Sequence, residues 1–250
     1  MPNEIIDEIS LQCFQVDILI SILTTYSRDL PYFARFRLTE AKGLDNVEED
    51  VISECSRENP TLFAHNQAWF NDVYESFKKH IVAKKPPKDW LLEQLASYQI
   101  VEYAPADPYQ RCIQSHAFRH GYDYKQLLSP EAGEIKLFDN FIQQIFEKEI
   151  AKEELKCGDT LIYFEAGVLK HIATYIGVKD SIHYALSKFG LGASYFHPID
   201  ITANYGRPTF YRMKNEIQKP DMRNTAHWND VLNQKVEERM SSRAKTALRL

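Results

Sequence analysis

Glycine is distributed unevenly along this chain, and that distribution constrains the fold more than any other feature. Only Gly43 lies in the first 120 residues, whereas the other eight glycines lie between Gly121 and Gly206. Glycine favours turns and disfavours helix interiors, so this distribution predicts helices first and turn-linked strands second. A helix-then-strand order is typical of the α+β class, which we expect for this chain.

Apolar residues recur at helical spacing over residues 70–81, and again over residues 90–95 after Lys-Pro-Pro-Lys. We therefore expect residues 1–100 to form a helical N-terminal region. A further amphipathic helix is predicted over residues 135–146. The last segment, residues 215–250, is charged and carries one weak apolar stripe, which predicts a C-terminal helical tail with a frayed end.

Short β-rich runs punctuated by Gly and Asp follow the predicted helices. Runs over residues 157–164, 171–177 and 182–185 predict three consecutive strands. Alternation along the second strand places His171, Ala173 and Tyr175 on one face. A turn over residues 177–180 would then make hairpin neighbours of His171 and His183, so that one imidazole acts as a base while the other holds its tautomer.

A cysteine upstream of these strands is a candidate nucleophile. A cysteine thiol is most reactive near a helix N-terminus, where the helix dipole and free N–H groups favour the thiolate and bind an oxyanion. Asp107-Pro108 is a helix-start signal, and Cys112 follows it closely. Cys112 lies one turn inside a helix that begins at Pro108, and nearer the end of one that begins near Gln110.

The order of these features resembles a known family. Cys112, the Gly-Asp strand over residues 158–164, the His-Ile-Ala-Thr-Tyr-Ile-Gly run over residues 171–177 and then His183 resemble the pattern of the NlpC-type cell-wall peptidases. These are a compact branch of the papain-like cysteine peptidases. The resemblance covers about residues 100–213. It implies a papain-like, NlpC-type catalytic domain over residues 101–214, in which a helix carrying the cysteine packs on an antiparallel sheet.

The resemblance also implies a reaction. A Cys112 thiolate would pair with His171, and His183 would orient that imidazole. The Cys112 backbone N–H would contribute to an oxyanion hole, and an amide bond would be cleaved through a thioester. Tyr109 and Tyr103 precede the cysteine closely enough to line a substrate cleft. The implied function is a cysteine hydrolase or peptidase acting on a peptide, protein or amide, with no cofactor and no metal.

Other functions stay open from the residues alone. A Cys112 thioester could transfer its acyl group to an acceptor other than water. A catalytically inactive scaffold that binds a protein partner through the N-terminal helices is favoured by Arg111-Cys112-Ile113, since the family has an acidic residue before its cysteine and a small one after it. Cys157 is the rival nucleophile. His116 and His120 have zinc-ligand spacing but no third ligand, which predicts surface histidines.

Composition and charge limit the classes of partner that we expect for this chain. A formal net charge of -5 and a pI near 5.9 argue against nucleic-acid binding. The longest apolar run, residues 16–23, is far shorter than the roughly 20 residues that span a bilayer, so we expect no membrane span. The acidic first residues differ from a secretory signal, so we expect a protein that is cytoplasmic as synthesised, with export by a signal-independent route left open. Four scattered cysteines fit a reducing compartment.

Overall fold

The structure is a computed structural model that describes residues 7–26, 57, 60–83, 87–105, 112–122, 144–165, 168–189, 192–202, 205–217 and 219–247. The chain forms two compact units. The helical unit comprises residues 1–100, 106–108 and 200–204, and the sheet unit comprises residues 101–105, 109–199 and 205–250. The α+β class expected from the sequence is confirmed.

The helical unit contains α1 (Glu8–Tyr26), α3 (Pro60–Val82) and α4 (Pro87–Ser97). The last two coincide with the helices predicted from apolar spacing. Their apolar stripes are buried within the unit, as the side chains of Phe70, Phe77 and Leu91 illustrate. Two N-terminal turns follow sequence rules, since both α3 and α4 begin at a proline, whose fixed φ suits the first helical position.

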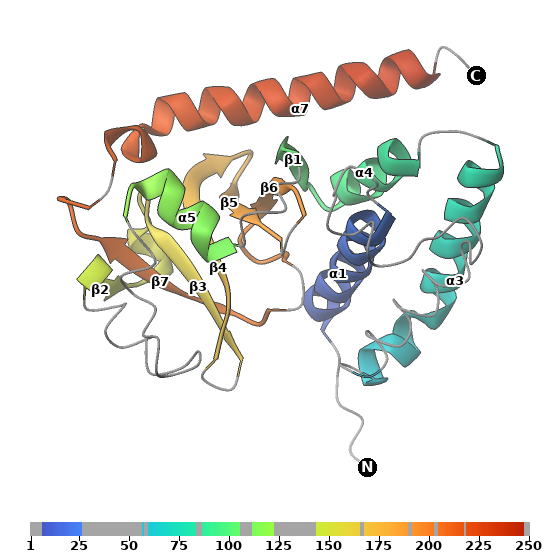
Figure 1. Cartoon of the computed structure of the whole chain (residues 1–250), viewed down its shortest axis with the longest axis horizontal. Helices are drawn as coiled ribbons and strands as arrows, with labels where there is room; N and C mark the ends of the chain where they lie inside the picture. The colour runs from blue at the N-terminus through green and yellow to red at the C-terminus, as the bar shows by residue number, and fades with distance from the viewer. Residues whose placement is uncertain are drawn as a thin grey trace. The chain divides into compact units, whose positions relative to one another are not determined.

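The sheet unit is built on seven strands (Figure 1). They are β1 (Val101–Ala104), β2 (Phe146–Ile150), β3 (Thr160–Glu165), β4 (Val168–Lys179), β5 (Ile182–Lys188), β6 (Ser194–Pro198) and β7 (Pro208–Met213). Their order is β1-β6-β5-β4-β3-β7-β2, and every neighbouring pair is antiparallel. The antiparallel sheet expected from the sequence is therefore present, with β4 at its centre.

Alternation along β4 separates two apolar layers. Ile172 lies with Ile162 and the start of α5 (Cys112–His120) on one face of the sheet, and α7 (Thr225–Ala247) packs on the same face through other residues. The opposite face carries Ala173 with Leu161. Both α5 and α7 thus cover one side of the same sheet (Figure 1).

The turn between β4 and β5 is tighter than the sequence predicted. Asp180 and Ser181 have φ values of 50° and 66°, which are typical of the two-residue turns that match strand twist. Gly177 lies inside β4 at a bulge instead of in the turn. The helix predicted over residues 135–146 is also corrected at its end, because Phe146 begins β2; residues 135–143 lie outside the described residues.

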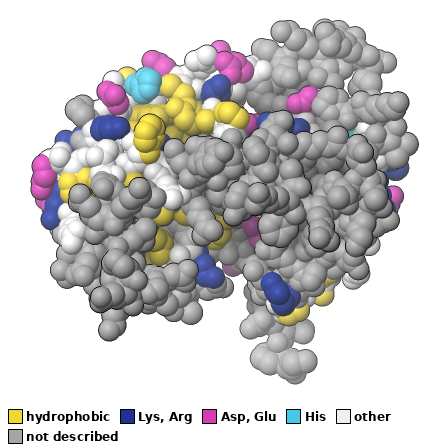
Figure 2. Space-filling view, viewed as in Figure 1, with side chains coloured by type: hydrophobic (Ala, Val, Ile, Leu, Met, Phe, Trp, Pro, Cys, Tyr) yellow, Lys and Arg dark blue, Asp and Glu magenta, His cyan; other side chains and the backbone are white. Residues whose placement is uncertain are grey.

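The residues beyond 220 belong to the sheet unit and pack against its sheet. The 3-10 helix η4 (Pro220–Arg223) leads into α7, whose Trp228 and Leu232 are buried against the sheet residue Phe196. Figure 2 shows hydrophobic side chains near the first half of α7, with acidic and basic side chains interspersed around them. Among the described residues, no helix is both long and apolar enough to cross a membrane.

Candidate functional site

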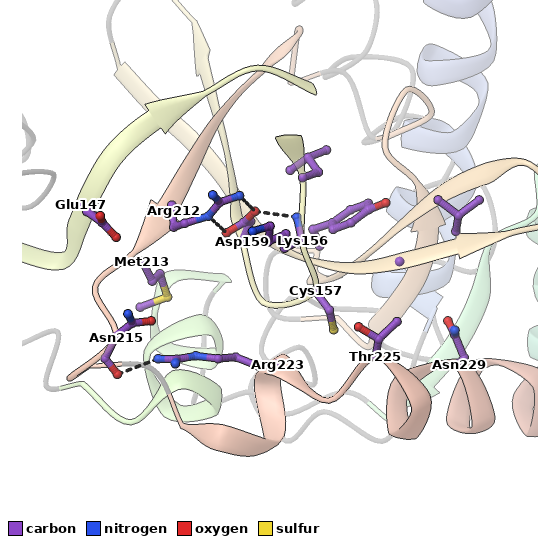
Figure 3. Close-up of a pocket in the computed structure, with 14 residues that line it drawn as sticks. Glu147, Lys156, Cys157, Asp159, Arg212, Met213, Asn215, Arg223, Thr225 and Asn229 are labelled. Atoms are coloured by element: carbon purple, nitrogen blue, oxygen red, sulfur yellow. Dashed lines mark hydrogen bonds and ion pairs between the residues drawn. The ribbon is translucent and has the colours of Figure 1, made fainter. Parts of the chain in front are cut away.

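A pocket of about 770 Å³ opens on the sheet unit (Figure 3). The turn before β3, the end of β4, β7 and the start of α7 each form part of its wall. Its lining includes Cys157, Tyr175, Arg212, Arg223 and Thr225. A pocket of this size with several converging polar groups is the default place to look for a ligand site.

An ion pair between Asp159 and Arg212 forms part of one wall of this pocket. The Asp159 carboxylate accepts hydrogen bonds from Arg212 Nε at 3.2 Å and Arg212 Nη2 at 3.0 Å. It also accepts one from the Lys156 backbone N–H at 2.7 Å. The Gly-Asp pair noted in the sequence therefore has a structural role, since Asp159 links the turn before β3 to β7.

Cys157, the rival nucleophile, lies in this pocket as a protonated thiol. Its Sγ donates to the Met222 carbonyl at 3.4 Å. Burial raises the pKa of the thiol to about 11, although a hydrogen bond with the Thr225 side chain opposes the shift. A thiol held in this form is a weak nucleophile at neutral pH.

Tyr175 connects the pocket to the predicted orienting residue His183. The Tyr175 hydroxyl and His183 Nδ1 are 2.9 Å apart, and burial raises the pKa of the Tyr175 phenol to about 12. The phenol is thus neutral at physiological pH and can donate to the imidazole. His183 therefore contacts a tyrosine, in place of the second histidine expected from the sequence.

Cys112 lies in α5 (Cys112–His120), and residues 106–111, where the sequence predicts the start of this helix, lie outside the described residues. Its half-buried side chain packs against the layer that contains Ile162 and Ile172. Burial raises the pKa of the thiol, and hydrogen bonds from the backbone N–H groups of Ile172, Ile113 and Cys112 oppose that rise. The thiol has favourable donors around it but remains protonated at neutral pH.

His171 lies on the opposite face of β4. Its ring is stacked between Phe189, with centroids 5.0 Å apart, and Tyr205, with centroids 4.5 Å apart. The residue is 1% exposed, and its Nε2 atom has no hydrogen-bond partner among the residues that the structure describes. Burial, followed by the charges of His197 and Arg119, lowers the pKa of this imidazole well below its usual value.

The structure does not bring the predicted triad together. Cys112 and His171 lie on opposite faces of the sheet because neighbouring strand residues point to opposite sides. His183 pairs in register with Val178, seven residues from His171 along β4, or roughly 23 Å at the rise of a strand. The short Asp180-Ser181 turn sets that register. The expectation that the two histidines are neighbours was wrong.

The predicted cleft tyrosines have different outcomes. Tyr103 lies in β1, where its ring packs against Phe196 at 5.1 Å and Trp228 at 6.0 Å between centroids. It contributes to the apolar layer under α7. Tyr109 lies outside the described residues.

His116 and His120 are fully buried, so the expectation of surface histidines was wrong. Their rings stack 4.2 Å apart on α5. His116 contacts the Tyr122 hydroxyl at 2.9 Å and the Thr160 hydroxyl at 3.1 Å, and His120 contacts the Thr174 hydroxyl at 3.0 Å. Within the part of the chain that the structure describes, no group of three or more side chains has the arrangement of a metal site. The available sequence signal was a threonine in each of two neighbouring predicted strands, Thr160 in β3 and Thr174 in β4, which pair in register.

A buried serine–histidine pair was missed from the sequence. His197 Nε2 lies 2.9 Å from the Ser187 hydroxyl, and His197 Nδ1 lies 2.9 Å from the Pro198 carbonyl. Because a carbonyl only accepts, Nδ1 carries the proton and Nε2 accepts from Ser187. Both residues are 0% exposed, so this pair stabilises the sheet and has no route to a substrate.

Comparison with known proteins gives no relative to guide the assignment. No protein-family model, no curated protein and no solved structure matches this chain.

Proposed function

We propose that the sheet unit is a non-catalytic ligand-binding module, in which the peptidase-like motif belongs to the framework, and that the pocket in Figure 3 is its binding site. One observation carries this proposal: Cys112 packs on the α5 face of β4, whereas the His171 ring is stacked on the other face. A thiolate and its imidazole base must lie within hydrogen-bond reach to act as a pair. With the sheet between them, neither residue activates the other.

Alkylation of Cys112 across a pH series tests the proposal. The thiol is labelled with iodoacetamide and the modified peptide is quantified in the wild type and in His171→Ala. We expect slow labelling below pH ~8.5, the region of an ordinary thiol, and the same profile in both proteins. Rapid labelling at neutral pH that disappears in His171→Ala would restore the Cys112–His171 pair and overturn the binding-module assignment.

A second candidate, a cysteine hydrolase acting on an amide through Cys112, has a specific observation in its favour. Backbone hydrogen bonds involving Ile172, Ile113 and Cys112 lower the pKa of the Cys112 thiol against the effect of burial, and such donors favour the thiolate form of a nucleophilic cysteine. On the same side of the sheet, the histidine one turn further along α5 is His116.

The same alkylation series separates this candidate from the first. A hydrolase that uses His116 would label rapidly at neutral pH in the wild type and in His171→Ala, and slowly in His116→Gln. Far-ultraviolet circular dichroism of each variant establishes that the fold is retained. Slow labelling in all three proteins supports the binding module.

A further inference from the structure

The helix α5 contacts the sheet mainly through polar side chains. It packs on β4 and β5 (Figure 1). Its buried residues are Ser115, His116, Ala117 and His120, so histidines form half of this buried set. A segment that buries little apolar surface opens locally at a lower free energy than the core around it. The attachment of α5 to the sheet therefore depends on how well its two histidines tolerate burial.

The imidazoles of His116 and His120 form a stacked pair. Their ring centroids are 4.2 Å apart, with an angle of 29° between the ring planes. Both residues are 0% exposed. Neutral aromatic rings attract each other in such an arrangement, whereas two imidazolium rings held this close would repel each other. The geometry of the pair is therefore that of two neutral histidines.

The hydrogen-bond partners of the pair are hydroxyl groups. His116 contacts the Tyr122 hydroxyl through Nδ1 and the Thr160 hydroxyl through Nε2, and His120 Nε2 contacts the Thr174 hydroxyl. The remaining nitrogen, His120 Nδ1, is buried and has no hydrogen-bond partner among the described residues. An imidazolium carries a proton on both nitrogens. Protonated His120 would thus bury an N–H group without an acceptor, which is unfavourable.

Positive charges at the end of α5 oppose protonation of the pair. Lys219 contacts this end, since its Nζ donates to the Phe118 carbonyl at 3.0 Å and its backbone N–H donates to the His120 carbonyl at 3.1 Å. Burial, followed by the charges of Arg119 and Lys219, lowers the pKa of His120 to about 3. Burial, followed by the charges of His120 and Arg119, lowers the pKa of His116 well below its usual value.

The strands beneath α5 do not offset these charges. On β4, His171 opposes protonation of His116 from the far face of the sheet. The Asp159 carboxylate, which precedes β3, is bound to Arg212 at 3.0 Å. Alternation along β5 places Tyr184 and Lys188 on the α5 side, and neither supplies negative charge, since burial raises the pKa of the Tyr184 phenol. Within the described chain, no carboxylate therefore favours a proton on either imidazole.

We propose that the stacked pair of His116 and His120 is an acid-sensitive switch, whose protonation in mildly acidic solution releases α5 from the sheet while the strands stay paired. The pair is neutral when α5 is docked, and it takes up protons when the helix leaves the sheet and both rings reach water. Return to neutral pH removes these protons and allows α5 to dock again. This proposal does not rest on the binding function, because the pocket in Figure 3 is not lined by α5 (Cys112–His120).

The direction of the switch follows from proton binding. Above pH ~6.5, the usual pKa of histidine, both imidazoles are neutral in the docked and released forms, so pH has no effect on docking. Below that pH the released form binds more protons than the docked form. The equilibrium then shifts toward release by up to about tenfold per pH unit for each histidine. Release uncovers the Cys112 side chain and the apolar residues Ile162 and Ile172.

Hydrogen exchange of the full chain, followed by mass spectrometry of peptic fragments, tests the proposal. Exchange rates are measured between pH ~7 and ~4.5 and divided by the intrinsic rate at each pH, which gives the opening equilibrium of each segment. In the wild type we expect the opening of α5 to increase about tenfold or more per pH unit below pH ~6.5. The strands β5 and β6 should keep their protection, and return to pH ~7 should restore that of α5.

Three variants and one matched control assign the effect to the pair. His116→Gln and His120→Gln should each make the response of α5 to pH shallower, because glutamine does not titrate. The double variant should respond little. His65→Gln makes the same change at an exposed histidine of α3 and should behave as the wild type. Far-ultraviolet circular dichroism at pH ~7 establishes that each variant is folded.

Several results would overturn the proposal. Loss of protection in β5 and β6 together with α5 would mean that acid unfolds the sheet unit as a whole. Unchanged protection of α5 down to pH ~4.5 in the wild type would mean that the helix is not released, and this result needs no variant. An equal response in the wild type and the folded double variant would mean that other groups control α5.

Discussion

Two arginines of the sheet unit differ in whether a neighbouring group compensates their positive charge. Arg212 is paired with the buried Asp159 carboxylate. Arg119 is half-buried on α5, and within the described part of the chain its Nε and Nη2 atoms have no hydrogen-bond partner. Burial lowers the pKa of the Arg119 guanidinium to about 10, although Tyr103, Tyr122 and Cys112 oppose the shift. One charge therefore stabilises the fold, whereas the other costs free energy.

Substituting each arginine by methionine should have opposite effects. Arg119→Met removes a poorly compensated charge while keeping the length of the side chain, so we expect the free energy of unfolding to rise by about 1 kcal/mol. Arg212→Met leaves Asp159 without its partner and should lower it by about 2 kcal/mol, a value reduced for the partial exposure of Arg212. Urea unfolding at pH 7.5 measures both. Equal destabilisation by the two changes would contradict this account.

The buried histidines make stability depend on pH. Burial lowers the pKa of His120 to about 3 and that of His116 well below its usual value. Between pH ~6.5 and the lowered pKa, the unfolded chain binds more protons than the folded one, so stability falls as the pH falls. Each group should cost up to about 1.4 kcal/mol per pH unit in that window.

The variant His120→Gln isolates one of these contributions. Glutamine still offers Thr174 a hydrogen-bonding group but does not titrate, so the slope of stability against pH between 6 and 4 should be shallower than in the wild type. Urea midpoints at several pH values give that slope. An unchanged slope would mean that His120 is protonated in the folded state.

At the scale of elements, the contact between β4 and α7 depends on a residue without a side chain. Gly177→Ala introduces a Cβ 3.2 Å from Asn229 Oδ1 at a φ of +134°, so we expect a loss of about 1–3 kcal/mol in stability. The double variant Gly177→Ala/Asn229→Ala removes the crowding but keeps the backbone strain, and should recover part of the loss. Thermal unfolding of the single and double variants measures both parts.

A substitution in the turn between β4 and β5 should stabilise the protein. Ser181 has a φ of 66°, a conformation that glycine adopts without a steric penalty. Ser181→Gly should therefore raise the thermal midpoint by a few degrees, whereas Ser194→Gly in β6 should lower it because glycine weakens a strand interior. A fall in both variants would show that the Ser181 side chain contributes more than its backbone strain costs.

Elements were easier to predict from this sequence than the site. Apolar spacing located α3 and α4, and β-rich runs located β3, β4 and β5, because these signals are local. Register and packing are not local. Alternation correctly grouped His171 with Tyr175, but nothing in the sequence indicated which face of the sheet the helix that carries Cys112 would cover. The helix covers the face of β4 opposite to His171, so the predicted pair of Cys112 and His171 does not form.

At the scale of the whole molecule, α7 is part of the sheet unit, and truncations should reveal where its contribution ends. Removing residues 237–250 leaves Trp228 and Leu232 in place, so the thermal midpoint should stay close to that of the full chain. Removing residues 224–250 exposes the layer that contains Phe196 and should cause unfolding or aggregation. Similar thermal midpoints for the two truncated proteins would show that α7 contributes little to the stability of the sheet unit.

The membership of residues 200–204 in the helical unit has a consequence for how this protein is made. This short segment leaves the ribosome after β6, long after α1, α3 and α4. Within the unit, the Cys13 Sγ atom donates to the Asp200 carbonyl at 3.5 Å. Because Asp200 lies 187 residues after Cys13, this contact of α1 can form only after that part of the chain has been synthesised. The first hundred residues therefore emerge during translation without a piece of their own structure, and the helical unit is completed only when most of the chain has been synthesised.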